Sequence, residues 1–382
     1  MREFEFKGVR LPAEAVEERA RVRAFLKAER DAGRYLPHLS SWSSFDPEFS
    51  KRAGAEGFIG VTWPREYGGR EQSSLTRFVI TEEMLAQGAP CGAHWIADRQ
   101  SGPQILRHGS ERAKQDILPR IARGECYFGI GMSEPDSGSD LAAVRTRATR
   151  VDGGWVINGS KIWTTNAHVV HYLIALVRTS DMGEDRHGGL TQFIIDMSKP
   201  GVTARPIHDL GGNHEFNEVS FQDYFVPDDM MVGSEGQGWS MVTSELAFER
   251  SGPDRFLSDF QLLVGLVDRL GTSPERREAI EVGRLVAHLA SLRRMSSSVA
   301  GLLDKGQSPN TQAALVKDMG TGFEREIPEI ARRLVAIEPS RDRDDRFSES
   351  LADVLLRAPS FTLRGGTREI LRSVIARGLG LR

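Results

Sequence analysis

The chain has few cysteines and no long apolar run. Its 382 residues include two cysteines, Cys91 and Cys126, which lie far apart and match no metal-binding spacing. A disulfide framework is therefore not expected, and a reducing compartment fits. No segment has the length and apolar character of a membrane span, and the opening residues, MREFEFKGVRLPAEAVEERAR, lack the apolar core of a signal peptide. We therefore expect a cytoplasmic protein without a membrane segment.

A strong excess of charge of either sign is also missing. The formal net charge is -3 and 39% of the residues are hydrophobic, so the composition fits an ordinary globular protein and offers no basic patch for nucleic acid. Five histidines lie in the middle of the chain, but their spacing matches no zinc signature, and we interpret them as structural or surface residues. They are His168, His171, His187, His208 and His214. No metal site is expected.

The spacing of apolar residues changes twice along the chain. Residues 1–124 have apolar positions at helical spacing, residues 125–233 have alternating and β-branched runs, and residues 234–382 return to helical spacing. We predict an α+β fold with an N-terminal α-helical domain, a central β-barrel or sandwich domain and a C-terminal domain like a four-helix bundle. In the last segment the helical patterns cover 239–250, 256–270, 275–305, 310–336 and about 368–378.

Two stretches of the middle segment have the composition of a binding site. Ser133–Asp140 is a turn-rich loop whose small hydroxyl residues and glycine leave backbone N–H groups free to face an anion such as a pyrophosphate. Trp163 is followed by Thr164 and Thr165, which places a flat ring beside hydroxyl groups and suits a planar heteroaromatic cofactor. Taken singly, the first stretch is equally compatible with a surface loop and the second with a core tryptophan.

Together, the segments YFGIGMSEPDSGSD (127–140) and WVINGSKIWTTN (155–166) resemble the flavin-binding middle domain of the acyl-CoA dehydrogenase family. The resemblance covers nearly the whole chain, through FIGVTWPREYGG (58–69), GGNHEFNEVSFQDYFVPDDMMVG (211–233), GQGW (236–239) and RGGTREI (364–370). It implies FAD as cofactor, an acyl-CoA thioester as substrate and an electron-transfer flavoprotein as electron acceptor. The positions that match the family's cofactor contacts are Ile130, Met132, Ser133, Gly138, Ser139, Trp163, Thr164, Thr165 and Thr367.

Desaturation of a thioester needs a base for the α-proton, and a carboxylate serves if burial raises its pKa. In the commonest family pattern the base is the glutamate of an EGT tripeptide, but this chain has Gly365 at that position. Glu369, on the following helix, is interpreted as a charge that complements the helix dipole. In a minority pattern the base lies on the first helix of the C-terminal domain, where Glu249 and Arg250 match. We expect Glu249 to be the base and Arg250 to orient it.

The chain also departs from the family pattern. An RxxFG motif and a GGNG-like turn, whose residues reach the FAD of a neighbouring subunit in typical members, are replaced at 269–277 and 333–340. Either each chain holds FAD mainly through its own β-domain, as in a homo-tetramer, or a related subunit supplies the missing contacts in a hetero-tetramer. Ala247 stands where an aspartate that assists CoA binding is common, so an acyl-carrier-protein thioester stays open.

Two other functions compete with the dehydrogenase. One is a non-catalytic subunit of a heteromeric dehydrogenase, although a scaffold needs neither the flavin segments nor Glu249. The other is a flavin oxidase or monooxygenase on the same fold, which would use oxygen directly and would be reoxidised rapidly by air.

Overall fold

The computed structural model describes residues 5–37, 40–181, 183–342 and 344–381, apart from the side chains of residues 244–249. The chain forms two compact units, each built from separated stretches of sequence. Unit 1 contains Met1–Ser44, Gln72–Cys91 and Ala247–Arg382, and unit 2 contains Phe45–Glu71 and Gly92–Leu246. The division of the sequence at 124 and 233 into three domains stays a prediction.

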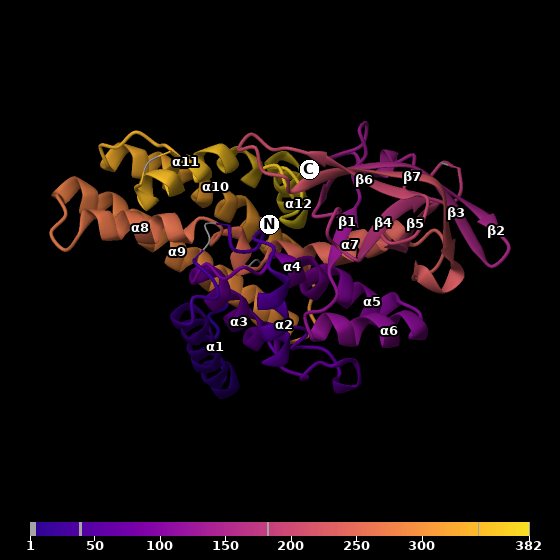
Figure 1. Cartoon of the computed structure of the whole chain (residues 1–382), viewed down its shortest axis with the longest axis horizontal. Coiled ribbons are helices and arrows are strands. Elements are labelled where there is room, and N and C mark those ends of the chain that lie inside the picture. The colour runs from indigo at the N-terminus through magenta and orange to yellow at the C-terminus, as the bar shows by residue number, and fades with distance from the viewer. Residues whose placement is uncertain (1–4, 38–39, 182, 343, 382) are drawn as a thin grey trace. The chain divides into compact units, whose positions relative to one another are not determined.

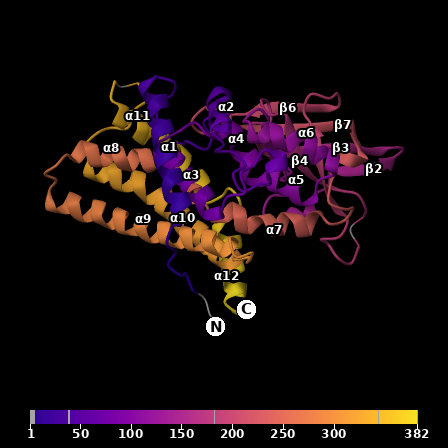
Figure 2. The same cartoon turned by 90° about the horizontal axis from the view of Figure 1, so that it is seen from below.

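Unit 1 is helical. Its helices are α1 (Ala13–Asp31), α3 (Ser74–Ala86), α8 (Phe260–Leu270), α9 (Arg276–Leu303), α10 (Asn310–Leu334), α11 (Arg346–Phe361) and α12 (Arg368–Gly378), with a 3-10 turn at Pro253–Arg255. Helix α10 packs against α8, α9, α11 and α12, and α8, α9 and α10 run alongside one another (Figures 1 and 2). The predicted C-terminal bundle is confirmed, and α11 is a helix that the sequence patterns did not predict.

The helices of unit 2 are α2 (Pro47–Ala55), α4 (Gly92–Ile96), α5 (Gly102–His108) and α6 (Glu111–Ala122), with a 3-10 turn at Arg65–Tyr67. A π-helical turn, Ala97–Ser101, joins α4 to α5. Side-chain caps explain where α2 and α6 begin, because Asp46 accepts from the N–H of Phe49 and Ser110 accepts from the N–H of Ala113. Helix α7 (Gly238–Arg250) starts in unit 2 and ends in unit 1.

One sheet of eight strands makes up the rest of unit 2. Its strands are β1 (Phe128–Gly131), β2 (Arg147–Val151), β3 (Gly154–Thr165), β4 (Tyr172–Arg178), β5 (Leu190–Asp196), β6 (Val202–Ile207), β7 (Phe216–Pro227) and β8 (Met231–Val232), with short 3-10 turns at Leu141–Ala143 and Asp228–Met230. The strand order is β6-β7-β3-β2-β4-β5-β8, and β1 pairs in parallel with β4. The predicted hairpin is present, since β2 and β3 pair around Asp152 and Gly153.

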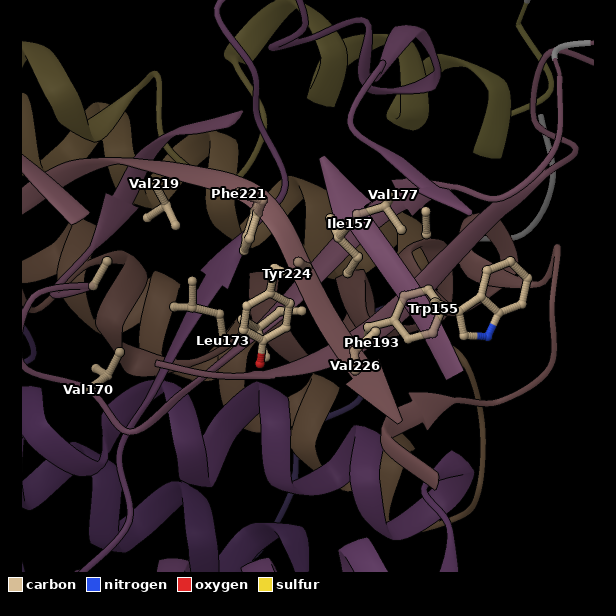
Figure 3. Packing of buried hydrophobic residues seen from close by; sticks show 14 of the residues in the cluster. Trp155, Ile157, Val170, Leu173, Val177, Phe193, Val219, Phe221, Tyr224 and Val226 are labelled. Atoms are coloured by element: carbon tan, nitrogen blue, oxygen red, sulfur yellow. The ribbon is translucent and has the colours of Figure 1, made fainter. Parts of the chain in front are cut away.

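A hydrophobic core lies inside this sheet. Side chains of β3, β4, β5 and β7 gather in it, among them Trp155, Leu173, Phe193 and Phe221 (Figure 3). Because strands that are far apart in the order share one core, the sheet is curled in the barrel-like manner that the alternating patterns predict. No helix in the described part of the chain combines the length and apolar character that a membrane crossing requires.

Candidate functional site

Trp163 lies on the surface of unit 2 in a strained backbone conformation. The pairing of β3 with β7 shifts register between Lys161 and Thr164, and Trp163 has a φ of 60°, which is unusual for a bulky residue. Its side chain is 56% exposed, whereas Thr164 is fully buried. The reading of Trp163 as a core residue is therefore wrong. Strain of this kind is common at functional sites, and the exposed indole fits a planar cofactor ring.

The loop Ser133–Asp140 is fixed at its base and open at its tip. Glu134 and Ser137 exchange backbone hydrogen bonds of 2.8 and 3.0 Å, and the hydroxyl of Ser137 donates to the carbonyl of Asp140. In contrast, the N–H groups of Gly138, Ser139 and Asp140 donate no hydrogen bond to any described residue. A Cβ atom added at Gly138 would meet no atom within 4 Å. Successive free N–H groups of this kind can bind a phosphate.

The remaining predicted cofactor contacts of unit 2 surround these two features. Ile130 lies on β1 opposite Ile174, and Met132 packs against the small core of Val144 and Leu176. The carbonyl of Thr164 accepts a hydrogen bond from the side chain of Asn217, which fixes the end of β3. The carbonyl of Ser133 accepts a hydrogen bond of 2.9 Å from the N–H of Ile162. The two sequence stretches are therefore joined directly.

Sequence reasoning missed Arg178, which supports the end of the loop. This residue is 6% exposed and its guanidinium donates to the carbonyls of Ala142, Val144 and Gly188 over 2.8 to 3.2 Å. One buried cation thus holds the turn that follows the loop. An arginine at the end of a strand gives no sequence signal for such a role, because its three acceptors come from two distant segments.

In unit 1, Lys317 holds the glycine loop that precedes α12. Its ammonium group is fully buried and donates to the carbonyls of Arg364, Gly365 and Gly366, the last two at 2.9 and 2.6 Å. Gly365 and Gly366 have φ angles of 62° and 95°, which favour glycine. Sequence reasoning missed this lysine too. Thr367 caps α12 by accepting from the N–H of Ile370.

The carbonyls that converge on Lys317 determine where the loop's N–H groups point. In a trans peptide the C=O and the following N–H point in opposite directions, and the chain has no cis peptide among its described residues. The N–H groups of Gly365, Gly366 and Thr367 therefore face away from Lys317. None of them donates a hydrogen bond within the described ranges. The loop thus presents a second set of free donors.

Arg250, at the end of α7, lies against this loop. It is 5% exposed, and a Cβ atom at Gly366 would come within 3.2 Å of its Nη2 atom. The end of α7 and the glycine loop, the two positions that the sequence resemblance offers for the base, therefore meet in unit 1. The side chain of Glu249 lies outside the described residues.

Arg364, which precedes the glycine loop, lies close to two buried carboxylates, Asp259 and Glu324. Arg364 lies over the Trp42 ring at 4.3 Å, donates to the hydroxyl of Ser258, and comes within 3.5 Å of Glu324. Neither carboxylate oxygen of the buried Asp259 has a hydrogen-bond partner among the residues that the structure describes. Burial, and then the Glu324 carboxylate, raise the pKa of Asp259 well above its usual range. Burial likewise raises the pKa of Glu324 and lowers that of Arg364, while the opposite charge of each partner acts against these changes.

Glu369 is exposed on the first turn of α12. Hydrogen bonds from its own backbone N–H and from the Thr367 side chain lower its pKa. A lowered pKa makes it a poorer proton acceptor, in agreement with its interpretation as a helix-terminal charge.

The histidines of unit 2 form contacts with one another and with aromatic rings. His168 and His214 stack with ring centroids 3.8 Å apart, and His208 lies 5.6 Å from His214. His187 stacks on Trp239. No group of three or more His, Cys, Asp or Glu residues in the described ranges is arranged to hold a metal ion.

Comparison with known proteins places these features in a family. Residues 12–125 match the model of the acyl-CoA dehydrogenase N-terminal domain, and residues 129–224 match that of the acyl-CoA dehydrogenase middle domain. The chain is 32% identical to the acyl-CoA dehydrogenase IpdE1 of Mycobacterium tuberculosis over 87% of each protein. It is 31% identical to the acyl-CoA dehydrogenase FadE34 of the same organism over 85% of the chain, and spans 45% of that longer protein.

Two solved structures have the same fold over almost their full length. The steroid acyl-CoA dehydrogenase Tcur3481-Tcur3483 has a TM-score of 0.85 and 26% identity, covering 99% of this chain and 100% of that one. The ChsE4-ChsE5 complex from Mycobacterium tuberculosis has a TM-score of 0.81 and 26% identity, covering 98% and 99%.

Proposed function

Because the chain belongs to the acyl-CoA dehydrogenase family, we propose that it introduces an α,β double bond into an acyl-CoA thioester with Glu249 as the base. FAD is the cofactor of this family, and it supplies the acceptor for the β-hydride when it is bound. The exposed indole of Trp163 and the free N–H groups of Gly138 and Ser139 fit its ring and its pyrophosphate.

The observation that carries the proposal is the contact between Arg250 and Gly366. Position 365 has no side chain that could accept a proton, so the base must come from elsewhere near the loop. Arg250 places the end of α7 at this loop, and Glu249 is the adjacent residue. An arginine beside the carboxylate orients it and balances its charge.

The glycine loop provides the second part of the proposed chemistry. The N–H groups that face away from Lys317 donate to the thioester oxygen and stabilise the negative charge that develops there as the α-proton leaves. Because Lys317 fixes the three carbonyls, these donors are preorganised before the substrate binds.

The test is the replacement Glu249→Gln, with Glu245→Gln as the matched control one turn earlier on α7. We expect Glu249→Gln to keep its FAD but to lose substrate-dependent bleaching of the flavin by several orders of magnitude, since the base is gone. Glu245→Gln should bleach at the wild-type rate. Bleaching of Glu249→Gln at the wild-type rate would show that another residue takes the proton.

We further propose that the chain assembles with a related subunit. Support comes from the replaced motifs at 269–277 and 333–340 and from the two similar structures, which are named as pairs of proteins. Co-expression with candidate subunits should raise the flavin content if they complete the site. A homo-tetramer with full flavin content would contradict the proposal.

We also propose the type of acyl group and the electron acceptor from the similar proteins and the family resemblance. The likeness to a steroid acyl-CoA dehydrogenase favours a bulky, ring-bearing acyl group on CoA, and the family resemblance favours an electron-transfer flavoprotein as acceptor. A panel of linear, branched and ring-bearing thioesters on CoA and on acyl carrier protein would test the first. Slow reoxidation of the reduced enzyme in air would exclude an oxidase. A cytoplasmic location also stays a prediction.

A further inference from the structure

Lys161 is a lysine with no exposed surface in the middle of strand β3. Its ammonium group lies 2.7 Å from Oε1 of Glu134 and 3.2 Å from the carbonyl oxygen of Met132. Removing an ammonium group from water is costly unless it is paired and hydrogen-bonded. Both conditions are met here, and both partners belong to the segment that enters the loop Ser133–Asp140.

The Glu134 carboxylate in turn holds the far end of the same loop. Its Oε2 atom accepts from the N–H of Arg145 at 2.6 Å, and its Oε1 atom accepts from the N–H of Thr146 at 2.9 Å. The chain between residues 134 and 145 is thereby closed into a ring by one side chain. Lys161 holds the Glu134 carboxylate that makes this closure.

The same lysine connects the loop to Trp163. Met132 and Glu134, on either side of Ser133, are both bound by Lys161, and Ser133 itself accepts from the N–H of Ile162. These bonds join residues 132–134 to residues 161–162, immediately before the exposed indole. The separation between the loop and the ring is therefore set by buried contacts.

The charges agree with this arrangement. Burial lowers the pKa of Lys161 to about 8, against the attraction of Glu134. Burial also acts to raise the pKa of Glu134, but the charge of Lys161 and the hydrogen bonds from Thr146 and Arg145 hold it below its usual range. Replacement of a buried ion pair by hydrophobic residues of similar volume is often neutral or stabilising, so stability alone does not explain this pair.

We propose that the Lys161–Glu134 ion pair positions the flavin site, by fixing the phosphate-side loop at Gly138 and Ser139 in register with the indole of Trp163. The inference rests on the proposed cofactor contacts. Both residues act through others and are positioning residues, since FAD would be bound by the loop and the ring.

The test compares Lys161→Met, Glu134→Gln and the double variant with the wild-type chain. We expect each single variant to bind FAD at least about tenfold more weakly, a typical size for coupling within one network. Amide hydrogen exchange of residues 134–146 should speed up in the protein without flavin. Glu134→Gln weakens the acceptor of the Arg145 and Thr146 N–H groups, and Lys161→Met removes the cation that holds this acceptor in place.

The double variant separates positioning from folding. Lys161→Met alone leaves the buried carboxylate of Glu134 without its cation, so the midpoint temperature of thermal unfolding of this variant should fall. In the double variant the midpoint should return toward the wild-type value, whereas FAD affinity should stay low. If the midpoint and the FAD affinity of the double variant both returned to the wild-type values, the proposal would be overturned, because the ion pair would then contribute to stability alone.

A matched control is the exposed ion pair between Arg186 and Asp140, which involves the same loop. Arg186→Met should bind FAD as the wild type does. Equal FAD affinity and equal amide exchange in all the variants would overturn the inference and leave the proposed site intact. Absence of FAD binding in the wild type and Arg186→Met alike, with or without a partner subunit, would overturn the proposed site and the inference with it.

Discussion

The guanidinium of Arg250 lies against the backbone of Gly366, with Nη2 only 3.2 Å from the point that a Cβ atom at Gly366 would occupy. We predict that Gly366→Ala lowers activity and costs about 1–3 kcal/mol of stability, since alanine is strained at a φ of 95° and its methyl group would displace Arg250. Turnover and chemical unfolding would measure the two effects.

Gly306 provides the control for this substitution. Its φ is 68°, but a Cβ atom there would meet nothing within 4 Å. Gly306→Ala should cost about 1 kcal/mol of stability from backbone strain alone and should leave turnover unchanged. If both variants lost turnover equally, the contact with Arg250 would have no special role.

Replacement of Lys317 should release the glycine loop. Lys317→Met leaves three carbonyls without their donor, and we expect a loss of about 3 kcal/mol in the free energy of unfolding. The maximal rate should fall more than the substrate's apparent affinity, because in the proposed mechanism the loop donors act mainly on charge that develops in the transition state. Steady-state kinetics and urea unfolding are the measurements, and the exposed Lys305→Met is the control. Unchanged kinetics in Lys317→Met would remove the loop donors from the proposed chemistry.

His94 should make unit 2 sensitive to mild acid. It is fully enclosed, hydrogen-bonded to Ser50 at 2.8 Å, and burial lowers its pKa to about 4. An unfolded histidine binds a proton near pH 6.5, so between pH 6.5 and 4 the unfolded state binds more protons than the folded one. Stability therefore falls as the pH falls through this window.

His94→Gln removes the titrating group while keeping a polar side chain. The variant should be less stable at neutral pH but should show a flatter decline between pH 6.5 and 4. Thermal unfolding at a series of pH values would measure this. Parallel curves for the two proteins would mean that other groups cause the acid sensitivity.

Trp163 should matter for flavin binding and little for folding. Trp163→Gly removes an exposed ring and relieves a left-handed backbone, so we expect stability to change by less than about 1 kcal/mol while FAD affinity falls strongly. Flavin fluorescence titration and thermal unfolding would separate the two. In contrast, Trp155→Ala, in the core at 3% exposure, should cost about 3–5 kcal/mol. A large stability loss in Trp163→Gly would contradict the assignment.

Local chemistry made part of the fold predictable. The turn at Asp152–Gly153 predicted the β2–β3 hairpin, and helical spacing predicted α9 and α10, because these signals lie within one stretch of chain. Helix α11 was missed since it follows a charged stretch and contains Pro359. Its start is nevertheless encoded by Asp345, whose carboxylate accepts from the N–H groups of Phe347 and Ser348.

Some residues of the candidate site could likewise be predicted from the sequence, and others could not. The loop at 133–140 and Trp163 were predicted as cofactor contacts because their residue types suit phosphate and a planar ring, and this assignment stays a prediction. Lys161, Arg178 and Lys317 were not found, because all of their acceptors except the carbonyl of Gly188 lie 27 to 49 residues away along the chain. The exposure of Trp163 was equally hidden, since it depends on a register shift against β7.

The backbone carbonyls of the glycine loop are held by Lys317, and the side chain of Thr367 caps α12 directly after the loop. None of these bonds depends on the side chain at position 365. A change of the side chain at position 365 therefore leaves these bonds in place. In the proposed mechanism the donors to the thioester oxygen and the proton acceptor therefore belong to separate segments of the chain, and the shape of the loop does not depend on which residue is the base.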